Sequence, residues 1–345
     1  MITNYCNHLS KDEFEFYVVY QHEPNLISLE RVRNAGCEAI QVTARKDNFI
    51  KSIFDTCKVI IKCKPDIVHA NISLNCWTAT IPAMLLGVKT RISHSHTAEK
   101  RTGLGHTLYA WVSRFLIKHS SNVLMTCGKE AALYLFGKTD DVFFLRNAID
   151  IEQFDKCHAT YRTRYQLENR TVLGHMGHFV WQKNHKRLID IFYEYKKKNE
   201  KAVLLLVGMG PLEEEIREYV LRLKIDKSVF FLGGIDVVGE FYASIDLFIM
   251  PSVCEGFPMV GIEAQAAGVK SLFSDNIDED IKLTNLASLF SLEKDNKEWA
   301  IQIDKVIKKS VDTSYKKELE EKGYSIFREV NKLGEIYIRC YTENR

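Results

Sequence analysis

The sequence predicts an α/β fold of two doubly wound domains, each built on a largely parallel sheet. Three observations lead to this prediction. Short apolar, β-rich runs alternate with helical patterns along nearly all of the 345 residues. The alternation pauses at a polar bridge, residues 155–170, and then restarts. Ala202–Val207 is apolar at every position, as a strand covered on both faces requires. A chain of this length suits two domains of ordinary size.

In the first series, strand and helix patterns follow each other in an order that favours parallel βαβ units. We expect strands at Phe14–Tyr20, Glu38–Ala44, Asp66–Ala70, Thr90–His96, Asn122–Cys127 and Val142–Leu145. We expect helices at Ile2–Leu9, Asn48–Lys62, Ala79–Leu86, Gly105–His119 and Lys129–Phe136. The chain is therefore expected to open inside a helix and to reach its first strand only at Phe14.

The second series repeats the same alternation. We expect strands at Val172–Met176, Ala202–Val207, Val229–Leu232, Leu247–Met250 and Ser271–Ser274. We expect helices at Lys186–Lys198, Leu212–Leu223, Val238–Ala243 and after Pro258, and a helical tail from Asn296. The domains are predicted at 1–155 and 156–330, with a C-terminal helix at 331–345 that can pack back toward the first. Ligands of such sheets bind at the carboxyl ends of the strands, so the site is expected in a cleft between the domains.

Composition excludes several classes of protein. The chain is 46% apolar and 27% charged, as soluble globular proteins are, and no run of about 18 apolar residues predicts a membrane-spanning helix. The N-terminus lacks a secretory signal pattern. Nine dispersed cysteines without a Cys-x-x-Cys pair suit a reducing cytoplasm and argue against a zinc site. We therefore expect a cytoplasmic location.

The charge is nearly balanced, at a formal +2, which argues against a dedicated nucleic-acid binder. Residues 1–150 carry 18 Lys and Arg against 14 Asp and Glu, a local excess of +4. This excess suits an anionic membrane face or a phosphorylated acceptor. A solvated surface with a chance asymmetry explains it equally well.

Two carboxylates, Glu255 and Glu263, lie eight positions apart in the most informative segment of the chain, residues 254–268. A buried strand precedes the segment, Pro258 suits the first helical position, and Gly268 is a natural stop. Glu255 is therefore expected on a loop at the carboxyl end of a strand, and Glu263 inside the following helix. The free N–H groups and the dipole at the start of that helix attract phosphate.

This arrangement resembles the signature of retaining glycosyltransferases with the GT-B fold, of the family 4 or group 1 kind found in bacterial capsule and exopolysaccharide assembly. The phrases SHSHTAE, WQKNHKRLIDIF and EGFPMVGIEAQAAG carry the same resemblance, which covers nearly the whole chain. It implies two Rossmann-like domains, the first on the acceptor side and the second binding a nucleotide sugar. It further implies that Glu255 faces the transferred sugar and that Glu263 binds the ribose. The donor sugar and phosphate would be held by the loop residues Gly256, Phe257, Pro258, Met259 and Val260.

The segment 174–185 looks like the phosphate loop of the same family. Lys183 matches its lysine, which offsets the charge that grows on a departing diphosphate, and Gly177 lies in the glycine part of the loop. His178 stands where the family has arginine, so we expect a weaker or pH-sensitive hold on the donor. Gly208 and Gly233 each end a strand, and the family's nucleobase meets backbone near the latter. Tight turns that need glycine are the alternative for both.

His94 and His96 are expected on one face of a strand, at its carboxyl end. The resembled family has a histidine near the donor sugar and acceptor there, and spacing does not decide which of the two takes that role. Buried structural histidines are the alternative, and a metal pair lacks a third ligand. Residues 99–101 are candidates for touching the acceptor. We expect no metal and no cofactor.

The opening of the chain departs from the resembled family, whose members usually begin with a strand and a glycine-rich loop. Here both are missing, so the first domain is expected to lack its N-terminal strand and to expose sheet edges and apolar surface. A truncated, a mis-started and a divergent chain all fit this pattern. Because that loop lines the cleft in the family, an inactive homologue acting as a binding partner stays a candidate function.

The resemblance implies a hexosyltransferase that moves a sugar from a nucleotide-sugar donor, commonly a UDP-sugar, with retention. The acceptor would be a saccharide on a polyprenyl-diphosphate carrier at the inner face of the membrane, in capsule, exopolysaccharide or O-antigen synthesis. A nucleotide-sugar epimerase of GT-B fold is a second alternative, because it shares the architecture and needs no acceptor. The transferase hypothesis requires Glu255, the helix start and Lys183 to converge on one pocket.

Overall fold

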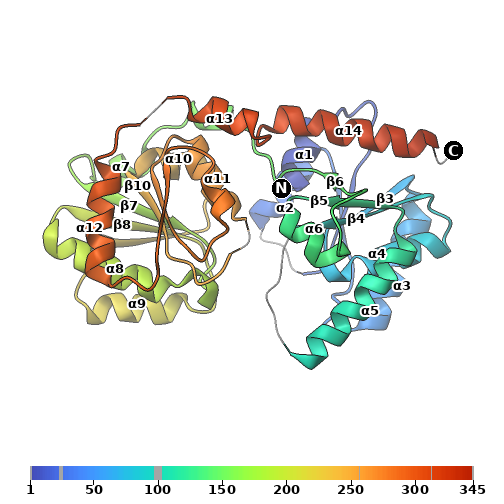
Figure 1. Ribbon diagram of the computed structural model, residues 1–345, viewed down its shortest axis with the longest axis horizontal. Coiled ribbons are helices and arrows are strands. Elements are labelled where there is room, and N and C mark those ends of the chain that lie inside the picture. The colour runs from blue at the N-terminus through green and yellow to red at the C-terminus, as the bar shows by residue number, and fades with distance from the viewer. Residues whose placement is uncertain (1, 23–25, 97–102, 256, 312, 344–345) are drawn as a thin grey trace. The chain divides into compact units, whose positions relative to one another are not determined.

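The computed structural model describes residues 2–22, 26–96, 103–255, 257–311 and 313–343. Its contacts divide the chain into two compact units, here called unit 1 (Met1–Ala148 with Ser325–Arg345) and unit 2 (Ile149–Tyr324) (Figure 1). The division falls after Ala148 rather than after residue 155, and residues 325–330 go with the first unit rather than the second. The first difference arises because Ile149, Ile151 and Phe154 pack into a core of unit 2. The second arises because the last helix, α14 (Ile326–Glu343), packs its apolar side on the sheet of unit 1.

Unit 1 holds two separate parallel sheets. The larger has the order β3-β4-β5-β6, and β1 and β2 pair only with each other among the described residues. The strands are β1 (Tyr17–Tyr20), β2 (Glu38–Gln41), β3 (Ile67–Ala70), β4 (Thr90–Ser95), β5 (Val123–Thr126) and β6 (Phe143–Phe144).

The helices of unit 1 are α1 (Ile2–His8), α2 (Leu26–Asn34), α3 (Phe49–Cys63), α4 (Trp77–Leu85), α5 (Leu104–Ser120), α6 (Lys129–Phe136) and α14. Helix α2 packs against β2 of the smaller sheet, and helices cover both faces of the larger one. Figure 1 shows α14 over one face, where Val330 and Leu333 pack on Ile92 and Met125. Helices α4, α5 and α6 bury residues such as Ala110 on the other face.

Unit 2 is one six-stranded parallel sheet with the order β12-β11-β10-β7-β8-β9. Its strands are β7 (Thr171–Met176), β8 (Ala202–Val207), β9 (Val229–Gly233), β10 (Leu247–Met250), β11 (Ser271–Ser274) and β12 (Ala287–Phe290). Chain order therefore runs outward from β7 in one direction to β9, then returns to β10 on the other side of β7. This is the doubly wound Rossmann order, which confirms the fold class expected from the sequence.

Both faces of this sheet are covered, as the apolar β8 predicts. Val203, Leu205 and Val207 belong to one core and Leu204 and Leu206 to the other, all of them buried. The first core includes α10 (Val238–Ser244), α11 (Met259–Ala266) and α13 (Tyr315–Glu321), and the second includes α8 (His185–Lys198), α9 (Glu213–Arg222) and α12 (Asn296–Ile307). Helix α7 (Thr160–Arg164) packs against α10.

Some element boundaries differ from the expected ones. The strand expected from Phe14 begins at Tyr17, because Phe14 and Phe16 pack as coil against the core under α14. Helix α11 begins at Met259, and Pro258 with extended backbone is its N-cap residue rather than its first helical one. Helix α2 and strand β12 were not expected. None of the described helices is long and apolar enough to cross a membrane.

Candidate functional site

Strand order in unit 2 reverses between the neighbours β7 and β10. The loops that leave the carboxyl ends of two such strands diverge to opposite faces of the sheet, and ligands of doubly wound folds bind in the crevice this leaves. Here the two loops are residues 177–184 after β7 and residues 251–258 after β10. These are the loops that carry Lys183 and Glu255.

Lys183 and Glu255 form an ion pair at this switch point, with 2.8 Å between Nζ and Oε1. Their side chains are only 16% and 18% exposed. Backbone contacts hold the two loops together: the Val253 N–H donates to the Gln182 carbonyl at 2.8 Å, and the Asn184 amide donates to the Pro251 carbonyl at 3.0 Å. The structure therefore brings together the two charges on which the sequence analysis depends.

A third loop, after β11, fixes the backbone of Glu255. Glu255 forms a parallel bridge with Ile277. The Ser274 hydroxyl donates to the Ser252 carbonyl at 2.6 Å, and the Asn276 amide donates to the Val253 carbonyl at 2.9 Å. The carboxylate is thus carried by a tethered segment, which lowers the entropy lost when it binds a ligand.

The glycines after β7, β8 and β9 have different structural reasons. A Cβ at Gly177 would lie 3.1 Å from the Lys183 side chain, so the absence of a side chain there lets the lysine cross the loop. Gly208 has φ +134°, and a Cβ there would lie 2.0 Å from the Gly177 carbonyl oxygen. Gly233 has φ +66° with open space around it, so conformation alone favours glycine. The Gly208 N–H donates to the Gly233 carbonyl at 2.8 Å.

His178 lies exposed beside this loop, and its Nδ1 is 3.1 Å from the Met209 carbonyl oxygen. Because a carbonyl only accepts, Nδ1 is the donor of this contact.

Two buried histidines, which the sequence analysis left without a role, lie beneath the loop. His175 Nδ1 is 2.8 Å from the Ile249 carbonyl oxygen, and the His175 and His185 rings meet edge to face at 4.9 Å. Burial, and then the charge of Lys183, lowers the pKa of His185 to about 4. Burial also holds the pKa of His175 well below its usual value. Both rings are therefore neutral near neutral pH, so the positive charge beside Glu255 comes from Lys183 and not from these histidines.

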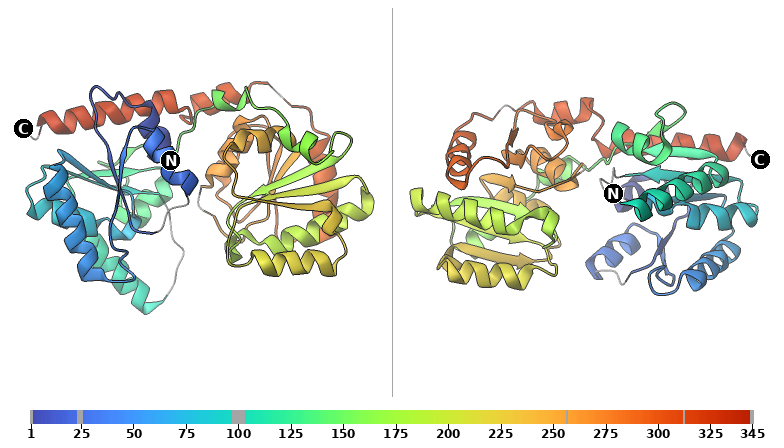
Figure 2. Two further views of the ribbon diagram at one scale, coloured as in Figure 1. Left: turned by 180° about the vertical axis from the view of Figure 1, so that it is seen from behind. Right: turned by 60° about the horizontal axis from the view of Figure 1, so that its bottom comes forward.

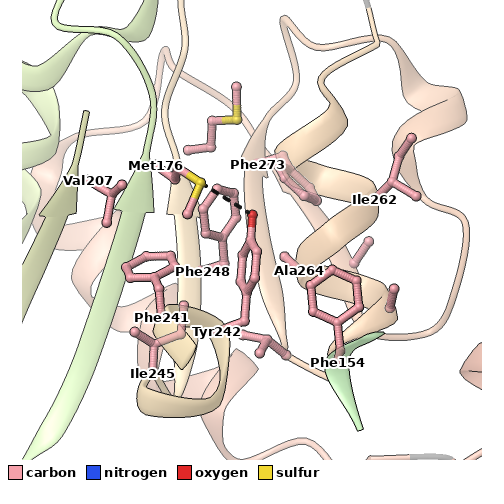
Figure 3. Packing of buried hydrophobic residues seen from close by; sticks show 14 of the residues in the cluster. Phe154, Met176, Val207, Phe241, Tyr242, Ile245, Phe248, Ile262, Ala264 and Phe273 are labelled. Carbon is pink, nitrogen blue, oxygen red and sulfur yellow. Dashed lines mark hydrogen bonds between the residues drawn. The ribbon is translucent and has the colours of Figure 1, made fainter. Parts of the chain in front are cut away.

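Glu263 lies half-buried on α11, and a buried tyrosine holds it. The Tyr242 hydroxyl is 3.1 Å from Glu263 Oε2 and 3.1 Å from the Val260 carbonyl. Burial, and then the charge of Glu263, raises the pKa of Tyr242 well above its usual value, so the hydroxyl stays a donor. Figure 3 shows Tyr242 rising from the core between Phe248 and Phe273, its oxygen also directed at the Met176 sulfur. The sequence analysis missed Tyr242.

Among the described residues, no side chain caps the start of α11. The N–H groups of Met259 and Val260 therefore keep the unsatisfied character of a helix N-terminus, which favours anions. The Phe257 ring stacks on Tyr324 at 5.4 Å, which anchors the loop before the helix. Gly256 lies outside the described residues, as do the acceptor candidates at 99–101.

In unit 1, His94 and His96 share a face as expected, with ring centroids 3.9 Å apart. A third ring, His69, joins them: its Nε2 is 3.0 Å from His94 Nδ1, and its Nδ1 is 2.6 Å from the Tyr337 hydroxyl of α14. His94 is 1% exposed, whereas His96 is half-buried and lies 2.9 Å from Asn71 Oδ1. Of the two predicted residues, His96 is therefore the one that reaches the surface.

Burial governs the charge of this histidine cluster (His69, His94 and His96). It lowers the pKa of His69 to about 3 and that of His96 to about 4, and holds that of His94 well below its usual value. The cluster is therefore neutral near neutral pH. Among the described residues, no group of three His, Cys, Asp or Glu side chains is arranged to hold a metal ion.

A cavity of about 940 Å³ lies at the carboxyl ends of β1 and β2 in unit 1. Its wall combines residues 21–22 after β1 and residues 41–44 at the end of β2 with residues of α3 and of the loop before it. The charged residues that line it are Lys46, Asp47, Lys51, Asp55 and Lys58. The Thr43 hydroxyl donates to Asp55 at 2.6 Å and favours its ionised form, so three lysines against two aspartates leave the wall a net charge of only +1.

Comparisons with known proteins give the family. Residues 1–153 match the family described as Glycosyltransferase Family 4, and residues 159–325 match Glycosyl transferases group 1. EpsF of Bacillus subtilis (strain 168), provisionally named a glycosyltransferase, is 29% identical over 87% of this chain and 82% of its own. The UDP-Gal:alpha-D-GlcNAc-diphosphoundecaprenol alpha-1,3-galactosyltransferase of Escherichia coli is 23% identical over 84% of this chain and 79% of its own.

Among solved structures, Anabaena HepE in complex with UDP and glucose has the same fold. It superimposes with a TM-score of 0.78 over 97% of this chain and 94% of its own, at 15% sequence identity. The two family matches together span nearly all of the chain, and the sheet order of unit 2 agrees with them. The chain therefore belongs to the glycosyltransferases with the GT-B fold.

Proposed function

We propose that the chain transfers a sugar from a UDP-sugar to a saccharide carried on a lipid diphosphate, with retention, at the inner face of a bacterial membrane. The observation that carries the proposal is the ion pair of Lys183 with Glu255 at the switch point of unit 2. A cation and a carboxylate at one strand edge, beside the open start of α11, match a diphosphate and the sugar attached to it.

Each end of the donor has a partner in this proposal. Lys183, His178 when charged, and the α11 amides bind the diphosphate, while Glu255 binds the transferred sugar. Glu263, oriented by Tyr242, accepts hydrogen bonds from the ribose hydroxyls. Gly177, Gly208 and Gly233 supply backbone rather than side chains along the nucleotide, which lets it approach closely.

The reaction breaks the bond between the anomeric carbon and the diphosphate oxygen. The electron pair leaves with the diphosphate, whose growing charge Lys183 and the helix amides offset. An acceptor hydroxyl then attacks the oxocarbenium-like centre from the side of the leaving group, and its proton goes to a diphosphate oxygen. Attack on that side retains the configuration at the anomeric carbon.

Two relatives support the choice of substrates. HepE binds UDP and glucose, and the Escherichia coli enzyme is named for a UDP-sugar donor, an acceptor on diphosphoundecaprenol and an alpha linkage. On the acceptor side, the three lysines of the cavity in unit 1 suit a substrate that carries phosphate. His96 is the residue of that unit we assign to the acceptor or the donor sugar.

The test is to incubate the purified chain with UDP-sugars, GDP-mannose and other nucleotide sugars, with and without a monosaccharide on a polyprenyl diphosphate. A glycosylated lipid, formed only when the acceptor is present and with the anomeric configuration of the donor by NMR, is expected. Conversion of the donor sugar without acceptor would identify an epimerase instead. Donor binding without either product would identify an inactive homologue.

A further inference from the structure

Three neighbouring helices of unit 1 carry an unusual amount of exposed apolar surface. Helix α4 packs against both α3 and α5, and Figures 1 and 2 show the three on one side of the larger sheet. Half of the exposed large hydrophobic residues in the described part of the chain lie on them or at the C-terminal end of α4. These are Phe49, Ile50, Phe54, Ile61, Met84, Leu85, Leu86, Leu108, Tyr109, Trp111, Val112 and Phe115.

Helix α5 turns mainly small residues toward the core of unit 1 and exposes large apolar ones, the opposite of an ordinary amphipathic helix. It buries Ala110, Ser113 and Ile117 against unit 1, while Leu108, Trp111 and Phe115 are 64%, 66% and 53% exposed. The three exposed residues are three to four positions apart and so form one stripe along the helix. Scattered apolar residues need no explanation, but a stripe of large apolar side chains facing outward marks a surface that binds another protein or a membrane.

Basic residues accompany this surface. The three helices hold five Lys and Arg and one acid, Asp55, which is half-buried and bound by Thr43. The five are Lys51, Lys58, Lys62, Arg114 and Lys118, all of them exposed. Lys58 and Lys62 lie 3.7 and 3.4 Å from Asp55 and Glu38, but such exposed pairs neutralise little. Helices α4 and α5 contain no acid at all.

We infer that the face formed by α3, α4 and α5 lies on an anionic lipid bilayer. Apolar and aromatic side chains with lysine and arginine around them are what the boundary between headgroups and acyl chains binds. A second copy of this chain is a poorer occupant, because lysine is depleted in protein interfaces and two equally basic faces repel. The inference deepens the proposed function, since it names the surface through which a lipid-linked acceptor is reached.

The acceptor cavity and this face share residues. Lys51 and Lys58 line the cavity and are also exposed on α3, beside Phe54. A diphosphate at headgroup depth would therefore meet lysines at the rim of the cavity while its lipid tail stays in the bilayer. This arrangement would account for the excess of basic residues in the first half of the chain, because the lysines would face lipid headgroups and phosphate.

The test is cosedimentation with vesicles of phosphatidylcholine alone and of phosphatidylcholine mixed with phosphatidylglycerol. We expect binding to the mixed vesicles that weakens with salt, and little binding to the neutral ones. The double variant Trp111→Ser, Phe115→Ser should lower the partition coefficient at least ~10-fold with an unchanged melting temperature, since both side chains are exposed. The matched control Leu221→Ser, on the exposed face of α9 in unit 2, should bind as the wild type does.

Equal binding of the double variant and the wild type would overturn the inference, and so would a wild-type dimer that the double variant dissociates. Transfer to an acceptor without a lipid tail, measured in the absence of vesicles, separates the two proposals. If vesicle binding follows the variants while no transfer occurs, the face stands and the proposed function fails. If transfer occurs and no vesicle is bound, the proposed function stands and the membrane face fails.

Discussion

Glu255→Gln is predicted to bind UDP more tightly than the wild type while transferring no sugar. Lys183 Nζ is engaged by the Glu255 carboxylate at 2.8 Å. A diphosphate must compete with that carboxylate for the ammonium and also approach its negative charge. Removing the charge and keeping the shape frees Lys183 for the phosphate. Transfer is lost because the carboxylate no longer binds the reacting sugar.

The magnitude follows from the exposure of the pair. Exposed pairs contribute ~0–1 kcal/mol, and breaking a buried pair costs ~3–5 kcal/mol. At 16% and 18% exposure this pair lies between them, and ~1–2 kcal/mol is the expected free energy of competition. Since ~1.4 kcal/mol is tenfold in affinity, the dissociation constant for UDP should fall ~5- to 30-fold.

Isothermal titration calorimetry with UDP at low salt measures this change. Lys183→Met should show the opposite result, with weaker binding than the wild type, because the cation is gone. Glu194→Gln is the matched control, since Glu194 pairs with Lys197 at 2.6 Å on α8, away from the loops of the switch point. Equal or weaker binding of UDP by Glu255→Gln would refute the idea that the two side chains compete with the donor.

Three further predictions concern stability and the ribose. Gly208→Ala should lower the free energy of unfolding by ~2–4 kcal/mol, because the new Cβ strains the backbone and overlaps the Gly177 carbonyl oxygen. Gly233→Ala, which meets no neighbouring atom, should lower it by only ~1 kcal/mol. Equal decreases for the two variants in urea denaturation would contradict the overlap at Gly208. Burial lowers the pKa of His69 to about 3 and that of His96 to about 4, whereas in the unfolded chain both are 6.5. Between these values and pH 6.5, the unfolded chain therefore binds more protons than the folded one. Stability should be complete above pH 6.5 and decline as the pH falls toward 4, and a flat profile in urea titrations would refute this. Tyr242→Phe should weaken UDP binding ~3- to 10-fold, because Glu263 loses the hydrogen bond that orients it. An unchanged dissociation constant for UDP by calorimetry would show that the hydroxyl does not orient Glu263.

Local patterns in the sequence predicted much of the fold. The fully apolar Ala202–Val207 predicted a strand with helices on both faces, and the alternation around it predicted the parallel doubly wound sheet that unit 2 has. Lys198 and Phe136 end helices where expected. The signature segment predicted a loop at the end of a strand followed by a short helix, and Gly268 adopts the left-handed conformation expected of a stop.

Contacts between segments far apart in the sequence could not be predicted from such local patterns. Tyr242 approaches Glu263 only because α10 and α11 pack on the same face of the sheet. His69 joins His94 because β3 and β4 are neighbours, and nothing in a single strand pattern indicates the partner. The end of unit 1 at Ala148, and not at residue 155, has the same origin, because Ile149, Ile151 and Phe154 pack into a core of unit 2.

The periodicity of α5 was ambiguous for another reason. The helix has two stripes, one of small residues such as Ala110 and Ser113 and one of large apolar residues such as Trp111. Hydrophobicity alone favours burying the larger stripe, but close packing beside α4 and α6 selects the smaller one. The outcome depends on the space available in the layer, which a sequence does not state.

The central claim is that Lys183 and Glu255 divide the two ends of an activated sugar between them. A crystal structure of the protein with a UDP-sugar that supports transfer tests it most directly. The account predicts Lys183 Nζ within about 3 Å of a diphosphate oxygen and the Glu255 carboxylate on the sugar, with their mutual bond broken. A diphosphate bound away from Lys183, with the ion pair intact, would contradict it.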